Sequence, residues 1–188
     1  RRVGWVRAVG VVSRGPAEWG CASGRGARAG VGQLNVYGLC ARDRSEAWPA
    51  EGLPGPKVQL RITPGVQAHT HEFIATGQDD SKFGFNLGNG DAMKAVDRAR
   101  RSASMRLVGV HCHIGSNVFE ASNFAKAAEV MAGFAIPLDL PELVLGGGLG
   151  VAYTVGDEAP PIAQWGSVRR DACAARGAQA GGRVTATV

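Results

Sequence analysis

Residues 105–117, MRLVGVHCHIGSN, decide the fold of this 188-residue chain. A run of apolar residues leads into His111-Cys112-His113 and ends at Gly115-Ser116. Apolar runs bounded by glycine and serine predict a buried parallel strand. In α/β folds, the loops after the C-terminal ends of such strands carry the chemical groups. An imidazole followed by a glycine and a hydroxyl therefore predicts a ring-stacking or acid–base group beside an anion-binding turn.

A second predicted strand, residues 142–145, has the same kind of ending. It runs into the glycine-rich turn Gly146-Gly147-Gly148-Leu149-Gly150. The backbone N–H groups of such a turn, together with the Ser116 hydroxyl, are donors that suit a phosphate. A glycine run by itself is equally typical of a flexible turn, so the two strand ends together carry the prediction.

Strands and helices alternate on both sides of these two strands. Hydrophobic periodicity and the placement of proline and glycine predict a strand at 58–63, helices at 92–101 and 119–134, a helix from Pro160-Pro161 to about Ala175, and a strand at 183–188. We expect the first helix to bury Met93, Val96 and Ala99. Alternating strands and helices predict an α/β fold with a parallel sheet. The chain is too short for a complete (β/α)8 barrel of the usual size. The sequence ends within the strand-like run 183–188, so we expect part of a larger fold.

Residues 1–56 show neither a strand period nor a helix period. They hold eight arginines against four acids and are rich in glycine. The domain division predicted here is an unpatterned lead segment, 1–56, followed by the folded domain, 57–188. The lead segment is either a flexible segment, an out-of-frame stretch or a divergent domain.

Composition excludes several classes of protein. Apolar residues make up 45% and charged residues 20% of the chain, which indicates a globular protein. No apolar run is long enough for a membrane span, so we expect a soluble, cytoplasmic protein without a membrane partner. The net charge of +5 comes from the two poorly patterned flanks, which argues against nucleic-acid binding. The four cysteines lack CxxC spacing, which argues against a zinc ribbon or a disulfide framework.

Two pairs of histidines have a spacing that could place both imidazoles on one metal ion. His69 and His71, and His111 and His113, are each two residues apart, so each pair would share one face of a strand. No cysteine or carboxylate stands at a supporting spacing, and we therefore predict no metal. Taken singly, His113 is also typical of a core histidine.

Four stretches in order, LRITPGV, HTHEFIATGQDDSKFGF, GVHCHIGSN and LVLGGGLGVAY, closely resemble the diaminopimelate decarboxylase family. These are pyridoxal-phosphate enzymes of the alanine racemase-like barrel class, and the resemblance covers residues 57 to about 165. It implies an incomplete (β/α)8, TIM-type barrel that binds pyridoxal 5'-phosphate. It also implies a lyase of lysine biosynthesis, which decarboxylates meso-diaminopimelate to lysine, and a homodimer in the full-length family.

The resemblance also assigns roles to individual residues. It implies that His113 is the catalytic residue stacked on the cofactor ring. The cofactor-binding residues it implies are Ser116, Gly146, Gly147 and Gly148 at the phosphate, with Arg61 and Lys82 lining the pocket. Without the resemblance, Lys82 could equally be a surface charge and Arg61 a salt-bridge partner.

The chain departs from the family pattern at the Schiff-base lysine. The family carries this lysine in an upstream YAxKA-like segment, whereas residues 1–56 contain no lysine and none of the four lysines present has that context. The family's EPGR segment, expected after 183–188, is absent as well. We therefore expect this chain to be inactive by itself. The alternatives are a non-catalytic fragment or mistranslated remnant that binds at most phosphate or pyridoxal phosphate, and another amino-acid decarboxylase of the same barrel group.

Overall fold

The computed structural model describes residues 33–37, 55–66, 84–153, 158–180 and 185–187. These residues form an α/β fold with one six-stranded sheet. In chain order the elements are β1 (Gln33–Val36), β2 (Lys57–Thr63), β3 (Phe85–Asn86), α3 (Asp91–Arg100), β4 (Arg106–His111), α4 (Ala121–Ala135), the 3₁₀ helix η2 (Ile136–Leu138), β5 (Glu142–Val144), α5 (Ile162–Ala180) and β6 (Thr185–Thr187).

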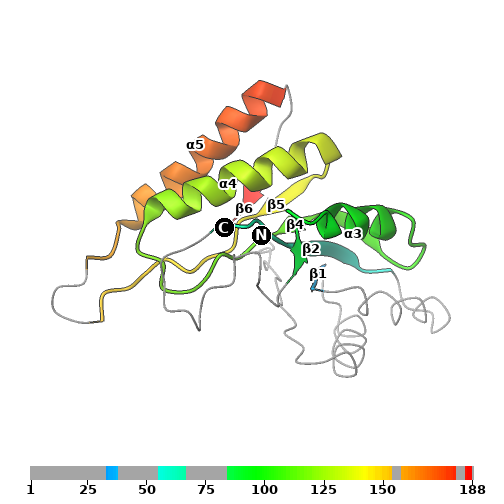
Figure 1. Ribbon diagram of the computed structural model, residues 1–188, viewed down its shortest axis with the longest axis horizontal. Coiled ribbons are helices and arrows are strands. Elements are labelled where there is room, and N and C mark those ends of the chain that lie inside the picture. The colour runs from blue at the N-terminus through cyan, green and yellow to red at the C-terminus, as the bar shows by residue number, and fades with distance from the viewer. Residues whose placement is uncertain (1–32, 38–54, 67–83, 154–157, 181–184, 188) are drawn as a thin grey trace, which may run out of the picture.

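Every strand pair in the sheet is parallel, and the strands lie side by side in the order β1-β2-β4-β5-β6. The short β3 pairs with the end of β2. The order does not reverse, and α4 and α5 lie together on one side of the strands (Figure 1). A doubly wound sheet reverses its strand order and carries helices on both faces, whereas a barrel does neither. The arrangement is that of an incomplete barrel.

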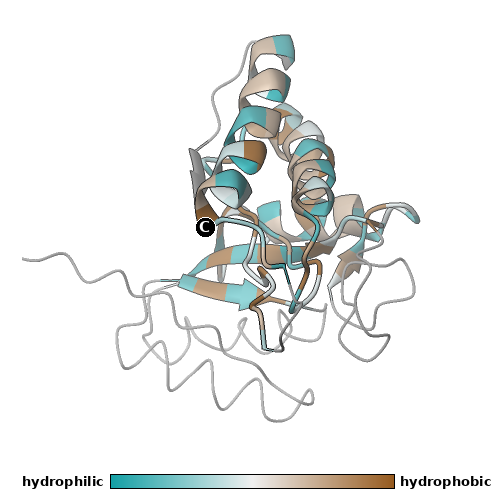
Figure 2. Cartoon of the chain, turned by 90° about the vertical axis from the view of Figure 1, so that its left-hand side faces the viewer, coloured by the Kyte–Doolittle hydropathy of each residue, from teal (hydrophilic) through white to brown (hydrophobic). Residues whose placement is uncertain are grey.

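The strand residues that face the helices form an apolar core. On β2 these are Val58, Leu60 and Ile62, each no more than 2% exposed. Figure 2 shows α4 and α5 stacked above the strands. The main cluster joins alternate residues of β1, β2, β4 and β5 with α3 and α4, including Ala92, Ala128 and Leu143. Because side chains alternate across a strand, the intervening residues face the opposite side of the sheet.

That opposite face is polar. The amides of Gln33 on β1 and Gln59 on β2 both donate to the Glu142 carboxylate on β5, at 3.0 and 2.9 Å. They reach it across Gly109, whose Cα is the partner of Glu142 in the β4–β5 register. Three strands are thus joined by side chains on the face away from the helices.

The predicted elements are confirmed in kind and position, with three differences. Met93 is 45% exposed, so its predicted burial is wrong; α3 instead packs through Ala92, Ala95, Val96 and Ala99, small residues that allow a close approach to the sheet. α5 continues to Ala180, beyond the predicted end. β1 lies inside the lead segment, where no strand was predicted at 33–36. The predicted domain boundary between residues 56 and 57 stays a prediction, because most of 1–56 lies outside the described residues.

None of the helices among the described residues combines the length and the apolar character that crossing a bilayer requires.

Candidate functional site

The two predicted strand endings meet at the C-terminal edge of the sheet. The Val118 amide donates to the Gly148 carbonyl at 2.8 Å, and the Gly150 amide donates to the Val118 carbonyl at 2.9 Å. Between them Val118 and Leu149 form a parallel bridge. The turn that holds Ser116 and the loop that holds Gly146–Gly148 therefore lie side by side, although 30 positions separate Gly148 from Val118 in the sequence.

Two glycines of this loop are required by close packing. Gly146 has φ +64°, and a Cβ there would lie 3.1 Å from His113 Nδ1 and would overlap the Cys112 carbonyl. Gly148 has φ +102°, and a Cβ there would overlap the Gly115 carbonyl. Positive φ favours glycine, and these contacts are with backbone that cannot move aside. At Gly147, by contrast, a Cβ would meet no atom of the described residues within 4 Å. The loop is packed at both ends and open in the middle.

His113 lies against this loop. Its Cε1 is 3.4 Å from the position of a Cβ on Gly148, so the imidazole borders both packed glycines. Burial and the nearby Arg61 charge lower the pKa of His113 below its usual value. A neutral imidazole at pH 7 offers a flat ring without charge. Ser116 is exposed in the adjoining turn.

Arg61 and His111 form a second pair on the polar face, immediately below the loops. They are Cα partners in the β2–β4 register. The Arg61 guanidinium lies over the Tyr37 ring, 5.1 Å from its centroid. Burial, with the charges of Arg61 and His113, lowers the pKa of His111 to about 4. His111 Nδ1 is buried and has no hydrogen-bond partner within the described part of the chain. The pair thus sets a fixed positive charge beside a neutral histidine.

Cys112, between the two histidines, faces the apolar core. It is fully buried, and burial raises the pKa of its thiol to about 12. It is therefore inert at neutral pH. Among the described residues, no group of three or more His, Cys, Asp and Glu side chains is placed to hold a metal ion. His69 and His71 lie outside the described residues.

The structure brings together six of the seven predicted site residues at one edge: Arg61, His113, Ser116, Gly146, Gly147 and Gly148. Lys82 lies outside the described residues. Sequence reasoning missed His111 as a neighbour of Arg61, and Tyr37, which lies in the unpatterned lead segment. It also missed Arg169 of α5, whose Nη2 donates to the Gly146 carbonyl at 2.9 Å. The signal for Arg169 was its spacing of four residues from Trp165 on a predicted helix.

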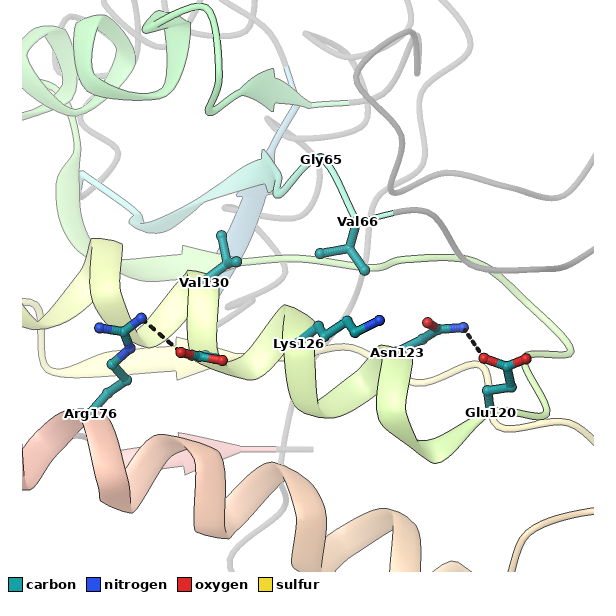
Figure 3. Close-up of a pocket in the computed structure, with 8 residues that line it drawn as sticks. Gly65, Val66, Glu120, Asn123, Lys126, Val130 and Arg176 are labelled. Carbon is teal, nitrogen blue, oxygen red and sulfur yellow. Dashed lines mark hydrogen bonds and ion pairs between the residues drawn. The ribbon is translucent and has the colours of Figure 1, made fainter.

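A pocket of about 540 Å³ lies away from these residues, along α4 (Figure 3). It is lined by Gly65 and Val66 after β2, by polar side chains of α4 such as Lys126, and by Arg176 of α5. Arg176 forms an ion pair with Glu129 at 2.8 Å. None of the predicted site residues that the structure describes lines this pocket.

The chain is similar to known proteins over most of its length. The family profile described as "Pyridoxal-dependent decarboxylase, pyridoxal binding domain" matches residues 49–184. The diaminopimelate decarboxylase of Mycobacterium tuberculosis is 39% identical over 147 residues, which are 73% of this chain and 33% of that protein. The diaminopimelate decarboxylase of Bacillus subtilis is 48% identical over 112 residues, which are 54% of this chain and 24% of that protein. The chain thus spans about a third or less of the length of these curated relatives.

Solved structures show the same similarity. The diaminopimelate decarboxylase of M. jannaschii in co-complex with L-lysine superposes with a TM-score of 0.67 at 26% identity, over 92% of this chain and 40% of that one. The enzyme from Helicobacter pylori complexed with L-lysine has a TM-score of 0.71 at 23% identity, over 88% and 41%, which supports the fold alone. Because the family profile covers well over half of its residues, the chain belongs to the pyridoxal-dependent decarboxylase family, through the pyridoxal-binding domain.

Proposed function

We propose that this chain binds pyridoxal 5'-phosphate at the C-terminal edge of its sheet, as part of a diaminopimelate decarboxylase. The observation that carries the proposal is the pair of hydrogen bonds joining Val118 to Gly148 and Gly150, which brings a serine turn beside a glycine loop. In our proposal, the phosphate accepts hydrogen bonds from the Ser116 hydroxyl and from the backbone of Gly147 and Gly148. Backbone N–H groups in such loops are suited to a dianion.

The residues present fit this cofactor. Open space at Gly147 leaves room for an anion to approach the backbone, and Gly146 and Gly148 could carry no side chain. His113 borders the same loop and is neutral at pH 7, which suits stacking on a pyridine ring. The positive charge of Arg61 lies close enough to both histidines to lower their pKa values, and it would offset part of the cofactor's negative charge.

When bound, pyridoxal phosphate supplies an electron sink for the carbon that loses CO₂. The chain's own residues then orient the ring through His113 and hold the phosphate. We propose meso-diaminopimelate as the substrate and lysine as the product, as the similarity to diaminopimelate decarboxylases suggests. Decarboxylation of another basic amino acid by the same barrel group is the second candidate.

Three of the four lysines of this chain lie away from the proposed site, so we expect the chain to be inactive by itself. Lys57 is the first residue of β2, at the end of the strand opposite the site. Lys94 is exposed on α3 and pairs with Asp91 at 3.1 Å, and Lys126 lines the pocket along α4. Only Lys82, outside the described residues, remains as a nucleophile for the cofactor aldehyde.

Reductive trapping tests the proposal. The chain is mixed with one equivalent of pyridoxal phosphate, reduced with borohydride and measured by intact mass and peptide mapping, while lysine formation from meso-diaminopimelate and CO₂ release from lysine and ornithine are assayed. We expect one equivalent of non-covalent cofactor by equilibrium dialysis, weakened at least several-fold by His113→Ala or Ser116→Ala. A single adduct at Lys82 would identify a surrogate nucleophile. Failure to bind the cofactor would overturn the proposal and favour a non-functional remnant.

We also propose a homodimer for the full-length enzyme, as the family resemblance suggests, and a cytoplasmic location. Light scattering on the purified chain, with and without cofactor, checks the oligomeric state.

A further inference from the structure

Arg169 is a buried arginine that has no part in the proposed contacts with the cofactor's phosphate or ring. It lies on α5 and is 2% exposed. Arginine is rarely buried to this degree unless an anion or several acceptors compensate its charge. Its neighbour Arg170 shows the ordinary case, with its side chain 74% exposed and paired with Asp171 at 3.2 Å.

The contacts of Arg169 are unusual for a buried cation. The guanidinium lies 4.2 Å from the ring centroid of Trp165 and 5.9 Å from that of Phe124. The ion pairs found among the described residues do not include it. Its Nε and Nη1 atoms are buried and lack hydrogen-bond partners among the residues that the structure describes. Within the described ranges Arg169 makes one hydrogen bond, from Nη2 to the Gly146 carbonyl at 2.9 Å.

This bond acts on the first peptide group of the glycine loop. The carbonyl of Gly146 and the N–H of Gly147 belong to one peptide unit, and no peptide bond in the described chain is cis. In a trans peptide the C=O and N–H point in opposite directions. With the carbonyl directed at Arg169, the Gly147 N–H is directed away from α5, at the residue where the loop is open.

We propose that Arg169 is a positioning residue, which holds the Gly146–Gly147 peptide from outside the sheet and makes the Gly147 N–H a stronger donor to an anion. A charge-assisted hydrogen bond to a carbonyl polarises the whole peptide group, so the N–H at its other end binds an acceptor more tightly. Trp165 and Phe124 keep the guanidinium in place, because their rings cover it. Burial lowers the pKa of Arg169, yet an arginine stays charged at neutral pH.

This proposal rests on the proposed function, because it assumes that the loop binds phosphate. The test therefore uses inorganic phosphate and the full 188-residue chain labelled with ¹⁵N-glycine. The Gly147 amide signal is assigned from its loss in Gly147→Ala, and its shift is followed as phosphate is added. Four chains are compared: the parent, Arg169→Met, Arg169→Gln and the exposed control Arg170→Met.

In the free chains, we expect the Gly147 proton signal to move upfield in Arg169→Met and to stay in place in Arg170→Met. The dissociation constant for phosphate should rise about tenfold in Arg169→Met, because the positive charge that polarises the Gly147 donor is lost. Arg169→Gln keeps a donor without the charge and should lose about threefold. Arg170→Met should stay within about twofold of the parent.

The outcomes separate the two proposals. If the parent shows no phosphate response at Gly147, the proposed function fails. If the parent responds and Arg169→Met binds phosphate equally well, the role of Arg169 is overturned while the proposed function stands. Should Arg169→Met not fold, judged by near-ultraviolet circular dichroism, Arg169→Gln carries the test, and unchanged phosphate affinity in that variant overturns the role.

Discussion

At the scale of single residues, the polar face combines a fixed charge with a histidine that resists protonation. Arg61 and His111 are direct neighbours in the sheet, and His113 follows on the same side of the strand. An imidazolium at position 111 would be buried beside the Arg61 cation, which explains why the pKa of His111 falls to about 4. The free energy of unfolding should therefore depend on pH through the protonation of His111.

The pH dependence has a definite sign. An unfolded chain protonates histidine near pH 6.5, whereas folded His111 protonates near pH 4, so the unfolded state takes up more protons in between. Stability should fall by about 3 kcal/mol as the pH drops from 6.5 to 4. His111→Phe, of similar size and unable to bind a proton, should remove most of that loss. Urea unfolding at pH 7, 5.5 and 4 measures it; parallel curves for parent and variant would contradict the prediction.

Two glycines of the loop, Gly147 and Gly148, should respond differently to alanine. Gly148→Ala places a Cβ into the Gly115 carbonyl at φ +102° and should cost about 2–4 kcal/mol of unfolding free energy. Gly147→Ala meets open space, so its stability should change by less than about 1 kcal/mol, but its methyl group should weaken cofactor binding at the open position. Denaturant unfolding and equilibrium dialysis measure the two effects. Equal stability losses in both variants would show that the loop packs differently.

The sequence allowed a prediction of which residues stand at the strand ends, but not of which side chains would pack around them. His113, Ser116 and Gly146–Gly148 could be chosen because an imidazole, a hydroxyl and a glycine run each stand directly after a predicted strand. The pairing of His111 with Arg61 depends on the register between β2 and β4, which periodicity does not specify. The burial of Arg169 depends on how α5 lies against α4 and the glycine loop.

At the scale of elements, β4 and β5 are fitted together through Gly109. A Cβ at this position would overlap the Glu142 carbonyl and lie 2.8 Å from the Glu142 Cβ. The space above Gly109 is what lets the Glu142 side chain accept from Gln59 on β2 and Gln33 on β1. One glycine in β4 thus allows a hydrogen-bonded link across the strands.

Gly109→Ala should separate β4 from β5 locally and destabilise the fold by about 2–4 kcal/mol. The matched control is Gly133→Ala on α4, where a Cβ would lie more than 4 Å from the other described residues. That change should stabilise the chain by up to about 1 kcal/mol, because alanine favours a helix more than glycine does. Urea unfolding of both variants gives the comparison. Effects of the same sign in both would refute this account of the β4–β5 contact.

The predicted boundaries of α4 and β2 agree closely with the observed ones, because both elements have a long, regular hydrophobic pattern. The exceptions have physical causes. β1 has only four residues within a glycine- and arginine-rich stretch, so its alternation was too short to recognise. Met93 was assigned to the buried face because it is hydrophobic. In the structure α3 instead buries alanines and Val96, and the longer Met93 side chain is exposed.

At the scale of the whole molecule, parallel strands gather the site at one edge. All strands point the same way, so loops from β2, β4 and β5 meet although their residues are far apart in the sequence. The family resemblance predicted this barrel arrangement, and the similarity to solved barrels confirms it. Composition and periodicity alone predicted only a parallel α/β sheet, because both barrels and open sheets alternate strands and helices.

A ligand held by several elements at once should stabilise the whole fold. If pyridoxal phosphate binds loops after both β4 and β5, saturation at about 100 times its dissociation constant should add about 2.7 kcal/mol to the unfolding free energy. Pyridoxal, which lacks the phosphate, should add much less at the same concentration. Ser116→Ala should reduce the effect of pyridoxal phosphate only, whereas Arg170→Met should leave both ligands unaffected. Urea unfolding with each ligand measures the difference. Equal stabilisation by the two ligands would mean that the glycine loop does not hold the phosphate.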